Sequence, residues 1–454
     1  MTAGSPFAVR GVVEGFYGRP WSHAQRLDLI PFLAAHGMNT FVYAPKDDPL
    51  LRRAWREPYG GRELERLREL VESCRAHEVG LVYCLSPGMS ISYSSESDVR
   101  ALGDKFGAVG ELGVRQFGLL LDDIPQQLQY EADRSRFADL VDAQASLIGR
   151  VFQGLPSGTG LIVCPTTYWG YGDEPYIARL GRAIDPRIGM FWTGRAICSP
   201  TIDLSDAATV ARSSMRLPTY WDNYPVNDVA MTDELHVGPY RGRDRHLYRF
   251  ATGVIANGME LFESSKIAFA TIADYLRAPE AYDPEASWQL ALREVVGDAD
   301  RDAYALFADN VRSSCLSAED APAVTRALET FLFRLNQGEG VAAAADLGAL
   351  ADRLLAAADH LLRGPVANPA LIAEGRPWIE AFETGAQAMR CMADLAVRGR
   401  LGADAAAELR PYLDRLRDAR VRVYGDTLTM TLTDLIDPRT VTEEAEVRAG
   451  GGRS

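Results

Sequence analysis

Cysteine is scarce in this sequence, with six cysteines spread over 454 residues. They stand far apart, with no Cys-x-x-Cys pair and no short spacing of the kind that metal sites use. Small secreted domains that depend on disulfides carry many more cysteines per residue. The sequence therefore predicts reduced, mostly buried thiols.

Long apolar runs and basic blocks are also lacking. No stretch of about 18 apolar residues could span a bilayer. The N-terminus has no basic stretch followed by an apolar core, so no signal peptide is predicted. The net charge of -14 argues against a protein dedicated to nucleic acid or to anionic membranes. We expect a cytoplasmic protein without membrane or nucleic-acid partners, and a homo-oligomer stays open.

Histidine motifs that bind metals are missing as well. The six histidines show no His-Glu-x-x-His and no paired spacing, which argues against metal ligation by histidine. A Gly-x-Gly at 338–340 follows no predicted strand, which argues against a dinucleotide loop. We therefore expect no cofactor and no metal. One alternative remains, in which the adjacent Asp122 and Asp123 hold Mg²⁺ through oxygen ligands.

What the sequence does contain, up to about residue 280, is an alternation of apolar β-type runs with amphipathic helical stretches. Near-continuous apolar strands followed by helices are typical of parallel strands that are covered on the outside. Eight such units in about 270 residues favour a (β/α)8 TIM barrel at 7–280, with an open doubly wound sheet as the alternative. The predicted strands lie at 9–18, 39–46, 80–88, 116–123, 160–170, 187–194, 218–223 and 253–258.

The β patterns stop after this region. Residues 285–425 are rich in Ala, Leu, Arg and Glu at helical spacing, which predicts an all-α helical bundle of five or six helices. The last residues, 440–454, are polar and rich in glycine, so a disordered tail is predicted there. The expected fold class is therefore an α/β barrel followed by a helical bundle.

The stretch FGLLLDDIP, residues 117–125, runs from an apolar strand into two adjacent carboxylates. No Lys or Arg stands within four residues of Asp122 and Asp123 to neutralise them. Ionised carboxylates at the end of a buried strand are costly unless something pairs with them. A helix cap would explain a single Asp, but Pro125 delays any helix after this pair.

Polar and aromatic residues also follow the other predicted strands, and the loops at the C-terminal ends of barrel strands carry the chemistry of this fold. Aromatic rings interleaved with carboxylates and amides suit a sugar, whose CH faces stack on rings while its hydroxyls bind Asp and Asn. The alternatives are that Lys46 only neutralises Asp47 or Asp48, and that Trp192 and Trp221 pack at the barrel rim. The set comprises Tyr17, Arg19, Lys46, Asp47, Asp48, Ser86, Asp122, Asp123, Thr166, Thr167, Tyr168, Trp192, Thr193, Trp221, Asp222, Asn223, Asn227, Asp228, Asn257 and Glu260.

Five motifs together resemble one known family. They are GVVEGFYGRPW (11–21), YAPKDDP (43–49), LLLDDI (119–124), FWTG (191–194) and YWDNYPVND (220–228). In this order they are similar to glycoside hydrolase family 84, the β-N-acetylglucosaminidases that include O-GlcNAcases and bacterial enzymes once called hyaluronidases. The resemblance implies exo-hydrolysis of terminal β-linked GlcNAc from a glycoside or glycoprotein.

The resemblance also implies roles for the acid pair. Asp122 would accept the N–H of the substrate's 2-acetamido group and hold its carbonyl oxygen against the anomeric carbon. Asp123 would protonate the leaving oxygen and then deprotonate the water that opens an oxazoline intermediate. This is a retaining mechanism without an enzyme nucleophile. For such an acid, we expect the adjacent carboxylate and burial to raise the pKa of Asp123.

The remaining substrate-binding residues follow from the same resemblance. Trp192 and Trp221 would wall the acetyl pocket. Gly258 departs from the family pattern, which has Pro at that position, so the role of Asn257 has the least support. The alternatives are a non-catalytic glycan-binding barrel, a hexosaminidase for a modified GlcNAc, and a metal-dependent lyase or aldolase. The implied residues are Gly15 (through its backbone carbonyl), Tyr17, Lys46, Tyr168, Trp192, Trp221, Asn223, Asp228 and Asn257.

Overall fold

The computed structural model describes residues 4–401 and 405–437. The chain divides into two compact units, of which the first is Met1–Val229 with Tyr240–Ser287 and the second is Ala230–Pro239 with Trp288–Ser454. Nothing in the sequence pattern separated the segment 230–239 from the barrel. The predicted tail at 440–454 lies outside the described residues.

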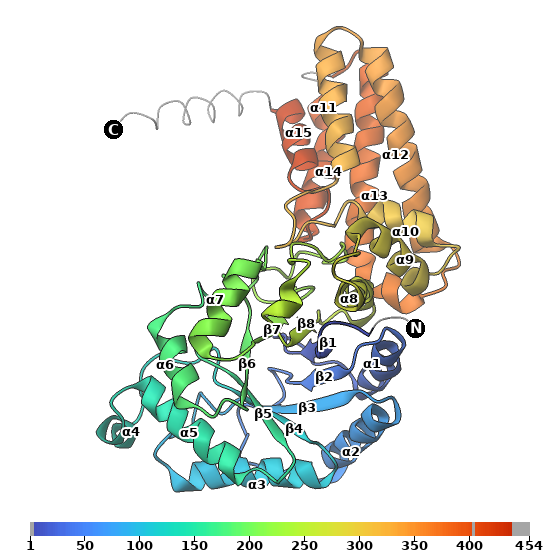
Figure 1. Ribbon diagram of the computed structural model, residues 1–454. Helices are drawn as coiled ribbons and strands as arrows, with labels where there is room; N and C mark the ends of the chain where they lie inside the picture. Colours follow the sequence, from blue (N-terminus) through green and yellow to red (C-terminus); the bar gives the residue numbers. More distant parts are fainter. Residues whose placement is uncertain (1–3, 402–404, 438–454) are drawn as a thin grey trace, which may run out of the picture. The chain divides into compact units, whose positions relative to one another are not determined.

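The first unit is a closed barrel of eight parallel strands in sequential order, β1 to β8. Figure 1 shows these strands with helices α1 to α8 of the same unit. The closed order confirms the predicted (β/α)8 barrel and excludes the open sheet. The strands are β1 (Val9–Glu14), β2 (Thr40–Tyr43), β3 (Gly80–Leu85), β4 (Gln116–Leu120), β5 (Gly160–Cys164), β6 (Gly189–Trp192), β7 (Thr219–Asp222) and β8 (Gly253–Asn257).

Helices of this unit begin where the sequence supplies capping groups. Ser22 accepts from the Gln25 N–H while the Gln25 side chain accepts from the Ser22 N–H, a capping box that starts α1. Asp139 caps α5 in the same way through the Asp142 N–H. The helices are α1 (His23–Ala35), α2 (Gly61–Ala76), α3 (Glu96–Glu111), α4 (Glu131–Arg136), α5 (Leu140–Gly154), α6 (Pro175–Ala183), α7 (Leu204–Ser214) and α8 (Phe262–Arg277), with a 3₁₀ turn at Leu247–Arg249.

Side-chain alternation along the strands decides which residues reach the barrel mouth. Val13, Val42, Leu120, Trp221 and Ile255 belong to one buried cluster inside the barrel. Because side chains alternate along a strand, residues two positions further on point the same way, toward the C-terminal opening. By this rule the layer above the core consists of Gly15, Ala44, Asp122, Asn223 and Asn257. Lys46 lies two residues after Ala44 and so points in the same direction.

The second unit is helical, as predicted. The long helices α12 and α13 bury apolar faces, in α12 through Leu347, Leu354 and Leu361 at intervals of seven residues. Helix α15 lies beyond the predicted limit at 425. Among the described residues no helix is long and apolar enough to cross a membrane. The helices that follow the barrel are α9 (Pro284–Val296), α10 (Arg301–Ala308), α11 (Pro322–Asn336), α12 (Gly340–Arg363), α13 (Pro369–Val397), α14 (Ala405–Asp418) and α15 (Thr427–Ile436).

None of the six cysteines forms a disulfide among the described residues, in line with the predicted reduced thiols. Three are buried, namely Cys74, Cys84 and Cys164, and three are partly exposed, so burial is less general than expected. Two of the buried thiols, Cys84 and Cys164, belong to the barrel cluster. They serve there as small apolar side chains.

Candidate active site

The two carboxylates after β4 both reach the barrel mouth, but by different routes. Asp122 continues the inward-facing row of the strand, and its side chain is only 7% exposed. Asp123 would point outward if the strand continued. Its backbone instead adopts φ 54°, in the left-handed region, where the penalty for Asp is smaller than for most side chains. This turn brings a second carboxylate to the same opening, and such locally strained backbone is common at functional sites.

Lys46 supplies the cation that the local sequence lacks. Its ammonium contacts Asp122 Oδ2 and lies 3.5 Å from Asp123 Oδ2. The lysine side chain is 4% exposed, so this attraction is little screened by water. The alternative of a magnesium ion between the carboxylates loses its support, because the Lys46 ammonium occupies that position.

The neighbouring acids of Lys46 have other partners. Asp47 accepts the Gly18 N–H at 2.8 Å, and Asp48 accepts the Leu50 N–H at 2.9 Å. Both carboxylates therefore stabilise loops through backbone hydrogen bonds. The alternative that Lys46 only neutralises these two acids is wrong.

Two tyrosines direct their hydroxyls at Asp123. Tyr17 donates to Oδ2 at 2.7 Å, and Tyr168 donates to Oδ1 at 2.9 Å. Burial alone would raise the pKa of Asp123, but the Lys46 charge and the two phenol hydrogen bonds outweigh burial and lower this pKa below its ordinary value. The expectation of a raised pKa is therefore wrong for this arrangement. It considered the adjacent carboxylate and omitted a lysine that is distant in sequence.

One oxygen of Asp122 has no partner. Oδ2 is bound by Lys46, whereas the buried Oδ1 finds no hydrogen bond among the described residues. Buried polar atoms are nearly always hydrogen-bonded, and leaving one unpaired costs about 1–3 kcal/mol. Oδ1 is thus a hydrogen-bond acceptor for which the described residues supply no donor.

Amides at the ends of β7 and β8 form a connected chain at the same opening. Asn257 accepts the Gly15 N–H at 3.1 Å and donates to Asn223 Oδ1 at 3.0 Å. Trp221 Nε1 donates to the same Asn223 oxygen at 3.0 Å, and Asn223 donates to the Ile197 carbonyl at 2.8 Å. A Cβ atom at Gly15 would lie 2.2 Å from the Trp221 ring, so glycine is required for this packing. These hydrogen bonds fix the orientation of the Asn223 and Asn257 side chains.

Gly258 stands where the family pattern has Pro, and its surroundings suit glycine. Its N–H donates to the Val13 carbonyl at 3.3 Å, a bond that proline cannot make. A Cβ atom here would also lie 2.5 Å from the ring of Trp21. Asn257 nevertheless stands in the mouth, next to Gly15 and Asn223.

Asp228 lies on the loop after β7 and holds the loop after β1. Its Oδ2 accepts the Tyr17 N–H at 2.7 Å. Burial raises the pKa of Asp228, although the Tyr17 N–H and the Lys46 charge act against this rise. The structure therefore brings eight of the nine predicted substrate-binding residues into the hydrogen-bonded and packed group around the two acids.

The comparisons with known proteins identify the family of this chain. A family model described as β-N-acetylglucosaminidase matches residues 10–309. The chain belongs to this family, which is glycoside hydrolase family 84. The five sequence motifs all lie inside the matched region, so the predicted resemblance is confirmed.

Individual relatives in the family are similar over different lengths. The chain is 36% identical over 274 residues to the Protein O-GlcNAcase of Rattus norvegicus and to that of Mus musculus. These matches cover 59% of this chain and only 30% of each relative, so this chain matches less than a third of their length.

Two solved structures are similar over most of the chain. An O-GlcNAc hydrolase mutant of Thermobaculum terrenum superposes with a TM-score of 0.91 at 33% identity, covering 98% of this chain and 97% of that one. A structure described as CpGH84B gives a TM-score of 0.85 at 27% identity, covering 95% and 77%.

Trp192 is the predicted family residue that the structure does not bring to this group. Phe191 belongs to the cluster inside the barrel and contacts Trp221 edge to face at 5.4 Å. Because neighbouring strand residues point to opposite faces, Trp192 points to the outer side of β6, where it is buried. This orientation argues against Trp192 as a wall of the acetyl pocket, and Phe191 is the aromatic neighbour of Trp221.

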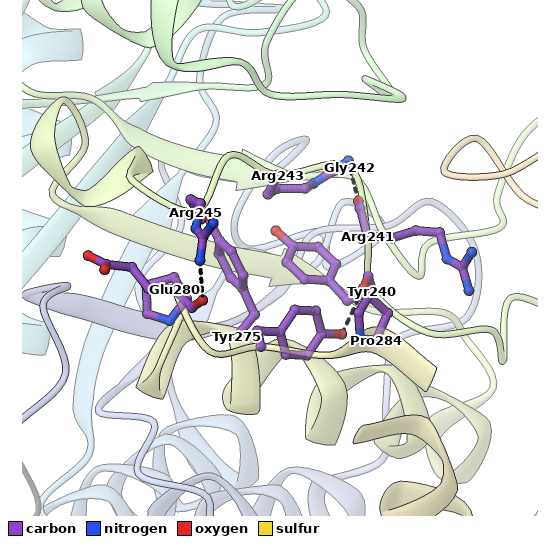
Figure 2. Close-up of a pocket in the computed structure, with 10 residues that line it drawn as sticks. Tyr240, Arg241, Gly242, Arg243, Arg245, Tyr275, Glu280 and Pro284 are labelled. Carbon is purple, nitrogen blue, oxygen red and sulfur yellow. Dashed lines mark hydrogen bonds between the residues drawn. The ribbon is translucent and has the colours of Figure 1, made fainter. Parts of the chain in front are cut away.

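Asp222 is a strand-end acid with a structural partner. Arg243 binds it through two nitrogens, with Nε at 2.8 Å from Oδ2, and Tyr240 donates to the same oxygen. Figure 2 shows Tyr240 and Arg243 in the wall of a separate pocket, which Tyr275 and Glu280 also line. The buried Arg243 neutralises Asp222, which explains an acid that the strand-end pattern had counted with the site.

Arg52 is a site residue that the sequence interpretation missed. Its Nη1 donates to the Tyr17 hydroxyl at 3.0 Å, one step from Asp123. A second basic residue six positions after Lys46 was the only signal in the sequence, and no pattern distinguished it from its neighbour Arg53.

We expect Lys46→Met to raise the pKa of Asp123, because it removes the nearest positive charge and leaves two carboxylates side by side. A ¹³C NMR titration of the aspartate carboxyls, assigned with Asp123→Asn, measures this shift. Lys266→Met is the matched control, since Lys266 pairs with Asp28 on the helices outside the barrel. An unchanged Asp123 titration in Lys46→Met would contradict the claim that the Lys46 charge lowers the pKa of Asp123.

Proposed function

We propose that the barrel hydrolyses terminal β-linked N-acetylglucosamine from glycosides or glycoproteins with retention of anomeric configuration. Membership of a glycoside hydrolase family supports the reaction class. The observation that carries the proposal is the buried, unpartnered Oδ1 of Asp122, beside a second acid that is one third exposed. An acetamido N–H is the donor that this oxygen lacks.

In the first step the substrate's acetamido oxygen attacks the anomeric carbon. Asp122 Oδ1 accepts the acetamido N–H, and its negative charge stabilises the positive charge that develops on that nitrogen. The Lys46 ammonium binds the other carboxylate oxygen, Asp122 Oδ2. Asp123 donates its proton to the glycosidic oxygen as the bond to the anomeric carbon breaks, and the N-protonated oxazoline forms, with its N–H still hydrogen-bonded to Asp122 Oδ1.

In the second step a water molecule opens the oxazoline. The Asp123 carboxylate takes a proton from this water, which attacks the anomeric carbon while the acetamido oxygen leaves. Two successive displacements at the same carbon return the original β configuration. The substrate provides the nucleophile, which places this scheme among the exceptions to two-carboxylate glycosidases.

The lowered pKa of Asp123 has to be reconciled with its role as an acid. The carboxyl is 32% exposed, so a bound sugar would displace the water that now stabilises its charge. A hydroxyl of the sugar would also engage the Lys46 ammonium. Both effects would raise the pKa of Asp123 in the complex. Substrate binding would therefore favour the protonated form that the first step needs.

The sugar would be held by the groups gathered around this pair. The Gly15 carbonyl, Lys46, Asp228 and Asn257 are positioned to bind hydroxyls, with Asn257 and Asp228 fixed by bonds to the Gly15 and Tyr17 N–H groups. Beside them, Trp221 and Tyr168 supply aromatic surface, and Asn223 is oriented by its bonds to Trp221 and Asn257.

Substrate preference tests this proposal most simply. We expect turnover of 4-nitrophenyl β-N-acetylglucosaminide and almost none of the β-glucoside, which lacks the acetamido nucleophile. Fluorination of the acetyl methyl group should slow hydrolysis progressively, because it makes the carbonyl oxygen less nucleophilic. Equal rates on both glycosides would exclude the mechanism. Binding without turnover would favour a non-catalytic barrel, and faster turnover of the galacto epimer would indicate a different hexosaminidase.

The pH dependence tests the change in Asp123 on substrate binding. Activity needs protonated Asp123, so it falls as pH rises through the pKa of this group. The kcat/KM profile reports the free enzyme and the kcat profile reports the complex. We therefore expect the basic limb of kcat to lie at higher pH than that of kcat/KM. Coincident limbs would show that the sugar leaves the acid unchanged.

A further inference from the structure

Arg52 lies on the loop between β2 and α2 and approaches the acid through one intermediate. Its Nη1 is 3.0 Å from the Tyr17 hydroxyl oxygen, and its guanidinium carbon is 5.3 Å from the centre of the Tyr17 ring. The Tyr17 hydroxyl in turn lies 2.7 Å from Asp123 Oδ2. The three side chains form a hydrogen-bonded line from the rim to the acid.

The chemistry of these groups fixes the direction of both bonds. Arginine can only donate hydrogen bonds, so the Tyr17 oxygen must be the acceptor from Arg52. A phenol has a single proton, and that proton then points to Asp123. Without Arg52 the Tyr17 oxygen could instead accept a hydrogen bond from the O–H of a neutral Asp123. Arg52 thus favours the ionised carboxyl over the protonated one.

The loop that carries Arg52 is anchored on both sides of it. Lys105 on α3 donates from Nζ to the Leu50 carbonyl at 2.5 Å and to the Glu57 carbonyl at 2.7 Å. Leu51 and Trp55 are buried, at 2% and 0% exposure. With the backbone held in this way, the Arg52 side chain is presented to Tyr17 from a fixed position.

We propose that Arg52 is a positioning residue for the general acid, because it keeps the Tyr17 proton directed at Asp123 and so sets the balance between the two protonation states. The inference rests on the proposed function, in which Asp123 acts first as an acid and then as a base. The protonated form serves the first step and the ionised form serves the second. A residue that shifts the protonation equilibrium of Asp123 therefore changes the relative rates of the two steps.

Other charged or titratable groups also face Asp123, and the effect of Arg52 has to be separated from theirs. Lys46 and Tyr168 favour the ionised form, and Arg52 adds a direct charge effect of the same sign. The carboxylates of Asp122 and Asp228 oppose ionisation through like charge. Lys46, Tyr168, Asp122 and Asp228 are unchanged in variants that replace Arg52 or Tyr17. The groups that face Asp123 are Tyr17, Lys46, Arg52, Asp122, Cys164, Tyr168 and Asp228.

The test is the pH profile of kcat/KM for the full chain on 4-nitrophenyl β-N-acetylglucosaminide. Arg52→Met should move the basic limb to higher pH by about one unit, a tenfold change in the protonation equilibrium of Asp123. Arg52→Lys keeps a charged donor and should return the limb toward wild type. Arg53→Met is the matched control, because Arg53 is exposed on the same loop, and its profile should equal wild type.

A double-mutant cycle separates an effect through Tyr17 from a direct charge effect. Tyr17→Phe should itself shift the limb upward, since it removes the donated hydrogen bond. Adding Arg52→Met to Tyr17→Phe should then shift the limb much less than it does in the wild type. Shifts that simply add would show that Arg52 acts without Tyr17, and they would overturn the proposal.

Asp123→Asn distinguishes failure of this inference from failure of the proposed function. The basic limb should disappear in Asp123→Asn if Asp123 is the acid. If it disappears there but Arg52→Met leaves the wild-type limb in place, the function stands and the role of Arg52 is wrong. If the limb persists in Asp123→Asn, the acid assignment falls and this inference falls with it. Unfolding midpoints are measured for every variant, and Arg52→Gln replaces Arg52→Met should the latter be unfolded at the assay temperature.

Discussion

The contact of one buried lysine with one buried and one partly exposed carboxylate is the constraint on which the site depends. Asp122 and Asp123 end an apolar strand, where two uncompensated charges would be strongly destabilising. The Lys46 ammonium binds one oxygen of Asp122 and lies near Asp123, which makes both charges tolerable. Within the described part of the chain, Asp122 Oδ1 has no hydrogen-bond partner. The same contact therefore compensates the charges of the acid pair while it binds only one oxygen of Asp122.

The barrel topology is what allows this contact. Lys46 and Asp122 are separated by 76 positions in the sequence, on segments that follow β2 and β4. Parallel strands in a closed barrel bring all their C-terminal ends to one face, and strict alternation sends every second side chain inward. Asp123 joins the group only because its backbone leaves the extended conformation. Fold and site are thus linked through backbone geometry at a few strand ends.

Sequence reasoning recovered the parts of the molecule that depend on local pattern. The strands, the barrel and the acid pair follow from apolar runs that end in polar residues. What it missed depends on tertiary position. The direction of the Trp192 side chain could not be predicted, because a four-residue strand does not reveal which of its residues face the barrel interior. Asp222 and Arg52 could not be interpreted without knowing their partners, Arg243 and Tyr17. The pKa of Asp123 was expected in the wrong direction for the same reason, since the decisive charge comes from another strand.

The central claim is that Asp122 Oδ1 binds the substrate's own acetamido group. A crystal structure of Asp123→Asn with a bound β-N-acetylglucosaminide tests it most directly, because this variant should bind substrate and turn it over slowly. The account predicts the acetamido nitrogen about 2.9 Å from Asp122 Oδ1, with Lys46 still on Oδ2. An acetamido group that points away from Asp122, with its N–H donated to another residue, would contradict the account.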